Sequence, residues 1–267
     1  MSRILIFAVF AVALGVGTTI AMLPTQGPRQ TKVHEQHDKS TYPIADYDAK
    51  EPSDLNMQGL RRARGKRHNV KLRATDKIDV RRLMLTEQSS SSWGGPPTHA
   101  AVESALPASK SDAVIIGEVT EAKAYLSEDK TNVYSEFTVR IEEILKNTTT
   151  VPLASGASIT TVRPGGAVRF PSGKIIQRGF GGKPFPVTKG RYVFFLDYEN
   201  DEQDYPIITA YELRRGAVLP LDGFDIDGRL LEPYAEYQQY KSWAEADFLN
   251  KVREAIALSA GGQGGTR

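Results

Sequence analysis

A dense basic cluster is the first group of residues in this sequence whose types and spacing suggest chemistry. Its members are Arg61, Arg62, Arg64, Lys66 and Arg67, so five cations fall within seven consecutive positions. Such a charge density attracts phosphate, anionic lipid or an acidic polymer. No aromatic side chain separates these cations, which argues against base stacking and a nucleic-acid partner. The cluster is a candidate for electrostatic contact; the competing interpretation is a solvated spacer whose charges keep it extended.

The histidines offer little catalytic chemistry. All four, His34, His37, His68 and His99, precede residue 110. His34 and His37 are three positions apart, whereas a zinc-protease helix carries histidines four positions apart with a glutamate beside the first. A Ser-His hydrolytic site would need one of these histidines to reach the rest of the chain. We therefore expect solvent-exposed histidines rather than metal ligands or catalytic bases.

Cysteine and acidic residues narrow the chemistry further. The chain has no cysteine, which excludes disulfides, a thiolate nucleophile and Cys-ligated metals. Asp222, Asp225 and Asp227 resemble part of a calcium loop, but aligning Gly228 on the loop glycine leaves Tyr234 where a bidentate glutamate is required. The sequence thus predicts a turn with exposed acids there. We predict no catalytic residue, no metal ligand and no cofactor.

Charge is unevenly divided along the chain. The total is +2, yet residues 24–110 hold 15 basic and 10 acidic residues, whereas residues 111–267 hold 18 basic and 22 acidic residues. A basic arm of net charge +5 thus precedes an acidic body of net charge −4. Residues 24–110 also lack a sustained apolar pattern and are rich in polar residues, glycine and proline, which predicts a largely disordered linker.

The N-terminus predicts export. Residues 4–23 contain no charged side chain and follow Arg3. The segment, 1–23 with its flank, fits either a cleavable signal peptide or an uncleaved hydrophobic helix that anchors the chain in a membrane. In both cases the positive-inside rule places the rest of the chain outside the cytoplasm. We expect a periplasmic or extracellular protein.

The body, residues 111–222, shows strand patterns. Ala113 to Val119 is a short apolar run in which Gly117 suggests a bulge, and in the segment Tyr134 to Leu145 the side chains of Phe137, Val139 and Ile141 should point inward. Further strand runs are separated by turn residues. They are Ser158 to Val162, Ala167 to Phe170 with Lys174 to Ile176, Arg191 to Leu196, and Tyr205 to Leu213 with Ala217 to Leu219. Five principal strands predict a mostly β fold, an OB-like five-stranded barrel.

A helix should follow the barrel in the C-terminal extension, residues 223–258. Ser242 to Glu245 reads as a capping box, and Phe248, Leu249, Val252 and Ile256 recur at helical spacing. This predicts an amphipathic helix over Trp243 to Leu258 that packs on the barrel. A Gly-rich tail, 259–267, ends the chain.

The order of these elements resembles a known superfamily. An opening strand with Gly117-x-Val119, a long second strand into Glu142-x-x-Leu145-Lys146 and a late Gly190-Arg191-Tyr192 strand are similar to the NTR/TIMP-like OB-type domains of exported bacterial proteins. The resemblance covers Ser111 to Asp222. Eukaryotic inhibitors of this group insert an N-terminal cysteine into the protease zinc site, and the present chain has no cysteine.

These observations favour an exported, non-catalytic binding or structural module of the cell envelope, which meets a protein, a glycan or another envelope component. The contact surface would be a barrel face or the Gly-rich loops of residues 179–189. An alternative, implied by the resemblance alone, is a regulator or inhibitor of an extracellular protease. A third interpretation is an enzyme that uses carboxylates or a bound metal. Oligomeric state is not predicted.

Overall fold

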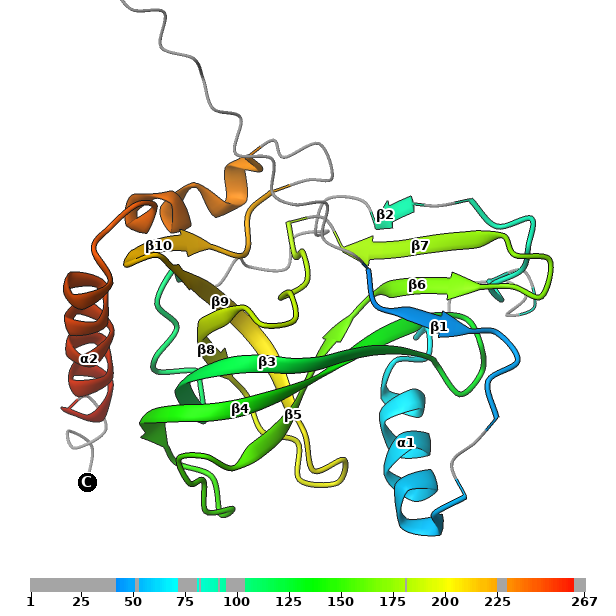
Figure 1. The fold of residues 1–267 in the computed structure, drawn as a ribbon, viewed down its shortest axis with the longest axis horizontal. Coiled ribbons are helices and arrows are strands. Elements are labelled where there is room, and N and C mark those ends of the chain that lie inside the picture. The colour runs from blue at the N-terminus through cyan, green and yellow to red at the C-terminus, as the bar shows by residue number, and fades with distance from the viewer. Residues whose placement is uncertain are drawn as a thin grey trace, which may run out of the picture. The chain divides into compact units, whose positions relative to one another are not determined.

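The computed structural model describes residues 42–50, 53–71, 81, 83–90, 92–94, 104–180, 182–224 and 230–261. These residues form a mostly β protein with a helix at its C-terminal end (Figure 1). The predicted N-terminal hydrophobic helix and export segment lie outside the described residues. Among the helices that are described, none has the length and apolar character needed to cross a membrane.

The larger sheet contains six strands. They are β3 (Ala113–Leu126), β4 (Val133–Asn147), β5 (Ser158–Pro164), β8 (Arg191–Leu196), β9 (Tyr205–Arg214) and β10 (Ala217–Pro220). Their order is β10-β9-β5-β4-β3-β8, and β8 also pairs with β9. The β5–β9 pair is parallel and the other pairs are antiparallel. The pairings therefore connect β3, β4, β5, β9 and β8 in a ring.

The predicted strand patterns are confirmed in this sheet. Phe137, Val139 and Ile141 are buried, as their alternation on β4 predicts. The pairing of β3 with β4 shifts register between Ile116 and Gly117, so the predicted bulge is present. A Cβ atom at Gly117 would lie 2.6 Å from Val139 Cγ1 and 2.9 Å from the Arg140 carbonyl oxygen, so the close approach of β4 requires glycine.

Two hydrophobic cores lie on opposite faces of this sheet. One contains Phe137, Val139 and Phe194, and the other packs Tyr211 and its neighbours against the C-terminal elements. Those elements are the 3-10 helix Glu232–Tyr240 and α2 (Glu245–Gly261), which buries Phe248, Leu249 and Val252. The predicted helix and its apolar face are thus confirmed, although α2 continues into the residues predicted as a tail.

The predicted capping box is wrong. The helix begins at Glu245, and Ser242 has a left-handed backbone conformation with φ of 66°. The reason is that this segment pairs with the β9–β10 hairpin: the Ser242 amide donates to the Val218 carbonyl and the Glu245 amide donates to the Gly216 carbonyl. The Glu245 carboxylate binds Arg191 at 2.6 Å instead of capping the helix.

A smaller sheet combines the body with the preceding segment. The hairpin of β6 (Gly166–Arg169) and β7 (Ile175–Phe180) is flanked in parallel by β1 (Ile44–Asp46) and β2 (Ser92–Gly94), and α1 (Leu55–Arg67) lies between β1 and β2 in the chain. The prediction of a low-order linker over residues 24–110 is wrong for these three elements. Backbone pairing holds β1 and β2, and Ala45 of β1 is also buried in a small hydrophobic cluster with Val168 and Ile176, whereas ion pairs hold α1.

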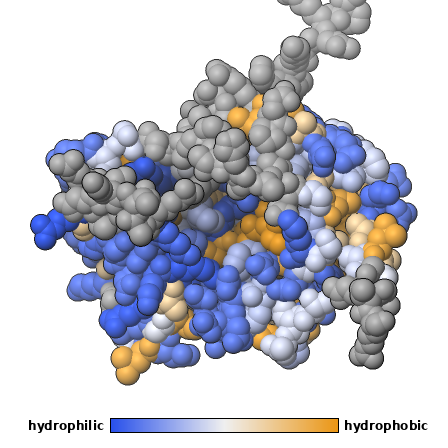
Figure 2. Space-filling view, turned by 180° about the vertical axis from the view of Figure 1, so that it is seen from behind, coloured by the Kyte–Doolittle hydropathy of each residue, from blue (hydrophilic) through white to orange (hydrophobic). Residues whose placement is uncertain are grey.

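The described surface is mostly polar. Viewed from behind, most of the described surface is hydrophilic, and hydrophobic residues gather in a few separate patches (Figure 2).

Candidate ligand-binding cavity

Helix α1 is the element that assembles the site. It begins after Asp54, whose Oδ1 accepts hydrogen bonds from the amides of Asn56 at 2.8 Å and Met57 at 3.3 Å. Only Arg64 and Gly65 of this helix are buried. Because α1 has no apolar face to bury, it docks on the body by polar contacts.

Arg64 provides the deepest of these contacts. Its side chain is 5% exposed; Nε lies 2.9 Å from Asp204 Oδ2 and Nη1 lies 3.2 Å from Glu136 Oε1. It also donates to the Glu202 carbonyl at 2.9 Å. Asp204 is fully buried at the start of β9, and this burial raises the pKa of its carboxyl while the nearby Arg67 and Arg64 act to lower it.

Arg67 completes the ion-pair cluster. Its Nη2 donates to both carboxylate oxygens of Asp204 at 2.9 Å, and its Nη1 lies 3.6 Å from Glu202. An ion-pair cluster, the α1 clamp, is thus formed by Arg64, Arg67, Glu136, Glu202 and Asp204. Two of the five cations predicted to contact a partner are therefore already neutralised within the molecule.

His68 is the C-terminal cap of α1, and the sequence alone does not predict that its side chain is packed. Its ring stacks on Tyr134 with centroids 4.5 Å apart. Burial lowers the pKa of His68 to about 4, and the positive charges of Arg67 and Lys71 act in the same direction. The prediction of a solvent-exposed histidine is thus wrong at this position; His34, His37 and His99 lie outside the described residues.

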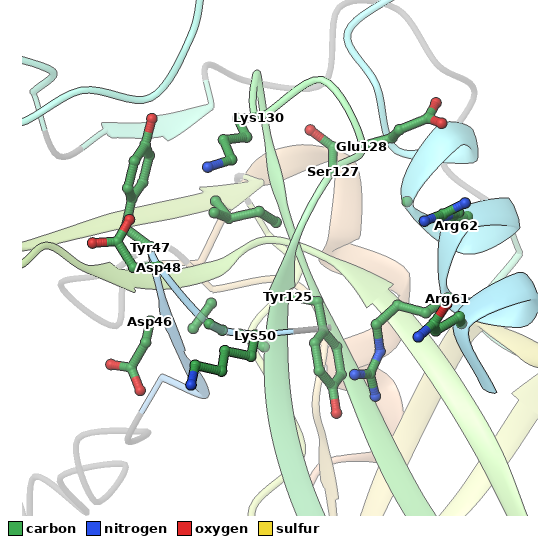
Figure 3. A pocket seen from close by; sticks show the side chains of 16 residues that line it. Asp46, Tyr47, Asp48, Lys50, Arg61, Arg62, Tyr125, Ser127, Glu128 and Lys130 are labelled. Carbon is green, nitrogen blue, oxygen red and sulfur yellow. The ribbon is translucent and has the colours of Figure 1, made fainter. Parts of the chain in front are cut away.

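A cavity of about 660 Å³ lies on the other side of α1 (Figure 3). Three parts of the chain enclose it: β1 with the residues that follow it, one side of α1, and the end of β3 with its turn into β4. Gly65 allows the close approach of α1 to this turn, because a Cβ atom there would lie 3.1 Å from the Glu128 amide nitrogen. Four basic side chains line the cavity: Lys50, Arg61, Arg62 and Lys130.

Two of these cations rest on aromatic rings. Arg61 Cζ lies 4.0 Å from the centre of the Tyr125 ring, and Lys130 Nζ lies 4.3 Å from the centre of the Tyr47 ring. Neither cation forms an ion pair with a carboxylate within the described part of the chain. A ring holds a cation in place without cancelling its charge. Arg61 and Lys130 therefore present oriented positive charge to the cavity, in contrast to the neutralised arginines of the α1 clamp.

The rings are themselves held by packing. Tyr47 stacks on Phe170 with centroids 4.9 Å apart, and Tyr125 contacts Tyr134 at 5.8 Å. Burial raises the pKa of Tyr125, so its hydroxyl stays protonated at neutral pH. The buried Nε atom of Arg61 has no hydrogen-bond partner among the described residues.

Carboxylates also reach the cavity. Asp46, Asp48 and Glu128 line it, and Asp46 lies 3.6 Å from Arg169 outside it. Acidic and basic side chains are therefore mixed within one cavity. No cluster of three or more residues able to hold a metal occurs in the described ranges.

The sequence identified only part of this site. Arg61 and Arg62 of the basic cluster line the cavity, while Lys66 is exposed on α1 and is not part of the lining. Lys50, Lys130, Tyr47 and Tyr125 were missed, because isolated lysines and tyrosines carry no spacing signal that distinguishes them from ordinary surface or sheet residues.

The predicted acidic turn is partly wrong. Asp222 is fully buried and binds Arg163 at 2.7 Å, an internal ion pair between β5 and the segment after β10. Asp225 and Asp227 lie outside the described residues. The Gly-rich loop, the other predicted contact surface, is partly packed inward, since Phe185 stacks against Phe137 with centroids 6.3 Å apart.

Comparison with known proteins adds no relative. No protein-family model matches the chain, and a search of curated proteins finds no match.

Proposed function

We propose that the protein is an exported, non-catalytic binding module and that the cavity beside α1 holds an anionic ligand from the cell envelope. The observation that carries this proposal is the pair of ring-supported cations. Arg61 and Lys130 face one cavity, are oriented by Tyr125 and Tyr47, and keep their charge available. Ordinary structural arginines in this molecule, such as Arg64 and Arg163, are paired with buried carboxylates instead.

The proposal includes an OB-like barrel as the scaffold. The ring of pairings through β3, β4, β5, β9 and β8 supports a five-stranded Greek-key barrel of this class. The resemblance of Ser111 to Asp222 to NTR/TIMP-like domains agrees with this assignment. OB-type barrels bind ligands with the loop between their first two strands and the loop between their last two. In this chain those loops follow β3 and β8.

Both loops face α1. The first contributes Ser127, Glu128 and Lys130 to the cavity, and the second contributes Glu202 to the α1 clamp. The helix therefore adds a wall and two arginines to a region where such barrels bind ligands. This placement supports a binding role for the cavity rather than a purely structural one.

The chemistry of binding follows from the lining. A carboxylate, phosphate or sulfate group would accept hydrogen bonds from the guanidinium group of Arg61 and from the Lys130 ammonium group. Because the rings restrict both cations before a ligand arrives, less side-chain freedom is lost on binding. Export, predicted from residues 4–23, would give this site access to the acidic polymers of the envelope.

Isothermal titration of the full chain in detergent with anionic oligosaccharides and with pyrophosphate tests the proposal. We expect saturable binding that weakens at higher ionic strength. The double variant Arg61→Gln, Lys130→Gln should lose at least about tenfold in affinity.

The matched control is Lys66→Gln, Lys241→Gln, which removes the same number of cations from exposed positions outside the cavity. It should bind like the parent protein. The proposal fails if the parent binds none of these anions, or if both double variants lose affinity equally.

A further inference from the structure

We propose that the ligand is an acidic saccharide, a hydroxyl-rich molecule that places one carboxylate in this cavity. This inference rests on the proposed function and makes its ligand class specific. It comes from a feature that simple anion binding does not explain, namely the three carboxylates in the same cavity as the four cations.

The lining has a small net charge. Lys50, Arg61, Arg62 and Lys130 contribute four positive charges, and Asp46, Asp48 and Glu128 contribute three negative charges, which leaves +1; counting Asp46 with its partner Arg169 outside the cavity raises this to +2. A polyphosphate or another densely charged polyanion would be repelled by these carboxylates at close range. A ligand of low anionic charge, such as one with a single carboxylate, matches this small net charge.

The charges are also interspersed. In Figure 3, Lys50 lies between Asp46 and Tyr125, and Lys130 and Glu128 lie on either side of Ser127. A zwitterionic peptide would be matched by a cavity with its acidic residues at one end and its basic residues at the other. Alternating donors and acceptors instead match hydroxyl groups, each of which donates one hydrogen bond and accepts others. Asp48 and Glu128 would accept from hydroxyls, while the cations would donate to hydroxyls and to the carboxylate.

The rings and the volume agree with such a ligand. Tyr47 and Tyr125 each carry a cation on one side and contact another aromatic ring, so they support the cations rather than offer open faces to a nucleobase. A cavity of about 660 Å³ is of the size that holds a drug-sized ligand, which is comparable to a short oligosaccharide.

The test compares four probes by isothermal titration of the full chain in detergent. They are cellobiouronic acid, which is a disaccharide with one carboxylate, the neutral disaccharide cellobiose, pyrophosphate, and the acidic dipeptide alanyl-glutamate. We expect cellobiouronic acid to bind at least about tenfold more tightly than any of the other probes. Equal binding of cellobiose would contradict the requirement for a carboxylate, and tighter binding of pyrophosphate would contradict the saccharide assignment.

Replacing an acidic residue of the cavity should lower the ligand affinity of a saccharide site but raise that of a plain anion site. In the variants Asp48→Ala and Glu128→Ala, a saccharide site loses an acceptor for a hydroxyl, so the affinity for cellobiouronic acid should fall about threefold to tenfold. A plain anion site loses a repulsive charge, so its affinity for every anion should rise.

The outcomes separate this inference from the proposed function. Pyrophosphate binding that depends on Arg61 and Lys130, together with tighter anion binding by Asp48→Ala, would support an anion site and contradict the saccharide. No binding of any probe would contradict both. A higher affinity for the acidic dipeptide alanyl-glutamate than for cellobiouronic acid would assign the site to a peptide and likewise reject the saccharide.

Discussion

At the scale of single residues, arginine occurs in this protein in two different settings. Arg64 and Arg67 face buried or half-buried carboxylates and act as structural ion pairs, whereas Arg61 rests on a tyrosine ring beside a cavity. All three belong to one basic cluster in the sequence. Their partners, rather than their type or spacing, decide which of them is available to a ligand.

The ring beneath Arg61 provides the first prediction. In Tyr125→Leu the guanidinium group loses a contact whose typical contribution is about 0.5–1 kcal/mol, so the affinity for an anionic ligand should fall about twofold to fivefold. Tyr125→Phe keeps the ring and should bind like the parent protein. Isothermal titration measures both, and an equal loss in the two variants would contradict a role for the ring.

His68 provides a prediction about pH. Its pKa is about 4 in the folded protein and near its ordinary value of 6.5 when it is exposed, so the unfolded chain takes up a proton first as the pH falls. The contribution of a neutral His68 to stability is therefore present above pH 6.5 and is lost progressively between about pH 6.5 and pH 4, by up to about 3 kcal/mol.

Urea denaturation between pH 7.5 and 4.5 checks this loss. The raised pKa of Asp204 has the opposite sign, because it makes the folded state take up a proton earlier than the unfolded chain. The variant His68→Gln isolates the histidine: it should lose stability less steeply as the pH falls. An unchanged slope would show that His68 does not determine the acid sensitivity.

At the scale of elements, α1 is a polar helix held on the body by the α1 clamp. In Asp204→Asn the guanidinium groups of Arg64 and Arg67 both lose a charged partner, and Arg64 keeps only Glu136, which should weaken docking by about 2–4 kcal/mol. Hydrogen exchange of the residue 55–67 amides should then accelerate while the β3 and β4 amides stay protected. Lys66→Gln, on the exposed side of the same helix, should leave exchange unchanged. Global acceleration would contradict a local role for the clamp.

The two glycines of α1 give a matched pair of substitutions. Gly59 has no atom within 4 Å of a built Cβ, so Gly59→Ala should stabilise α1 by about 0.5–1 kcal/mol. At Gly65 the same methyl group would press on the Glu128 backbone. Gly65→Ala should therefore push α1 away from the turn after β3, speed its hydrogen exchange and weaken ligand binding. Equal behaviour of the two variants would contradict the close packing at Gly65.

At the scale of the whole molecule, sequence patterns predicted the strands and the C-terminal helix but not the attachment of the N-terminal segment. The alternation of Phe137, Val139 and Ile141 is a local signal that requires no knowledge of the rest of the fold. The contact of Arg64 with the Glu202 carbonyl spans 138 positions, and no periodic pattern encodes it. The predicted capping box failed for a similar reason, because pairing with the β9–β10 hairpin is a tertiary contact.

The candidate site was predictable only in part, because most of its residues come together through tertiary contacts that leave no local sequence pattern. Charge density identified Arg61 and Arg62, but Tyr47, Tyr125 and Lys130 come together only when β1, β3 and α1 are assembled. The division into a basic arm and an acidic body corresponds to contacts between the two in the structure. Basic side chains of the arm pair with acidic side chains of the body at the α1 clamp, and the cations that remain beside the clamp face the cavity.

Chemical-shift mapping by NMR tests the central claim most directly, with the full chain in detergent titrated with cellobiouronic acid at low ionic strength. We predict that the largest amide shifts fall on the three segments that enclose the cavity, residues 45–50, 58–65 and 124–130, and that Arg61→Gln, Lys130→Gln abolishes them. Shifts confined to other surfaces, or shifts that persist in that double variant, would contradict the assignment of this cavity as the binding site.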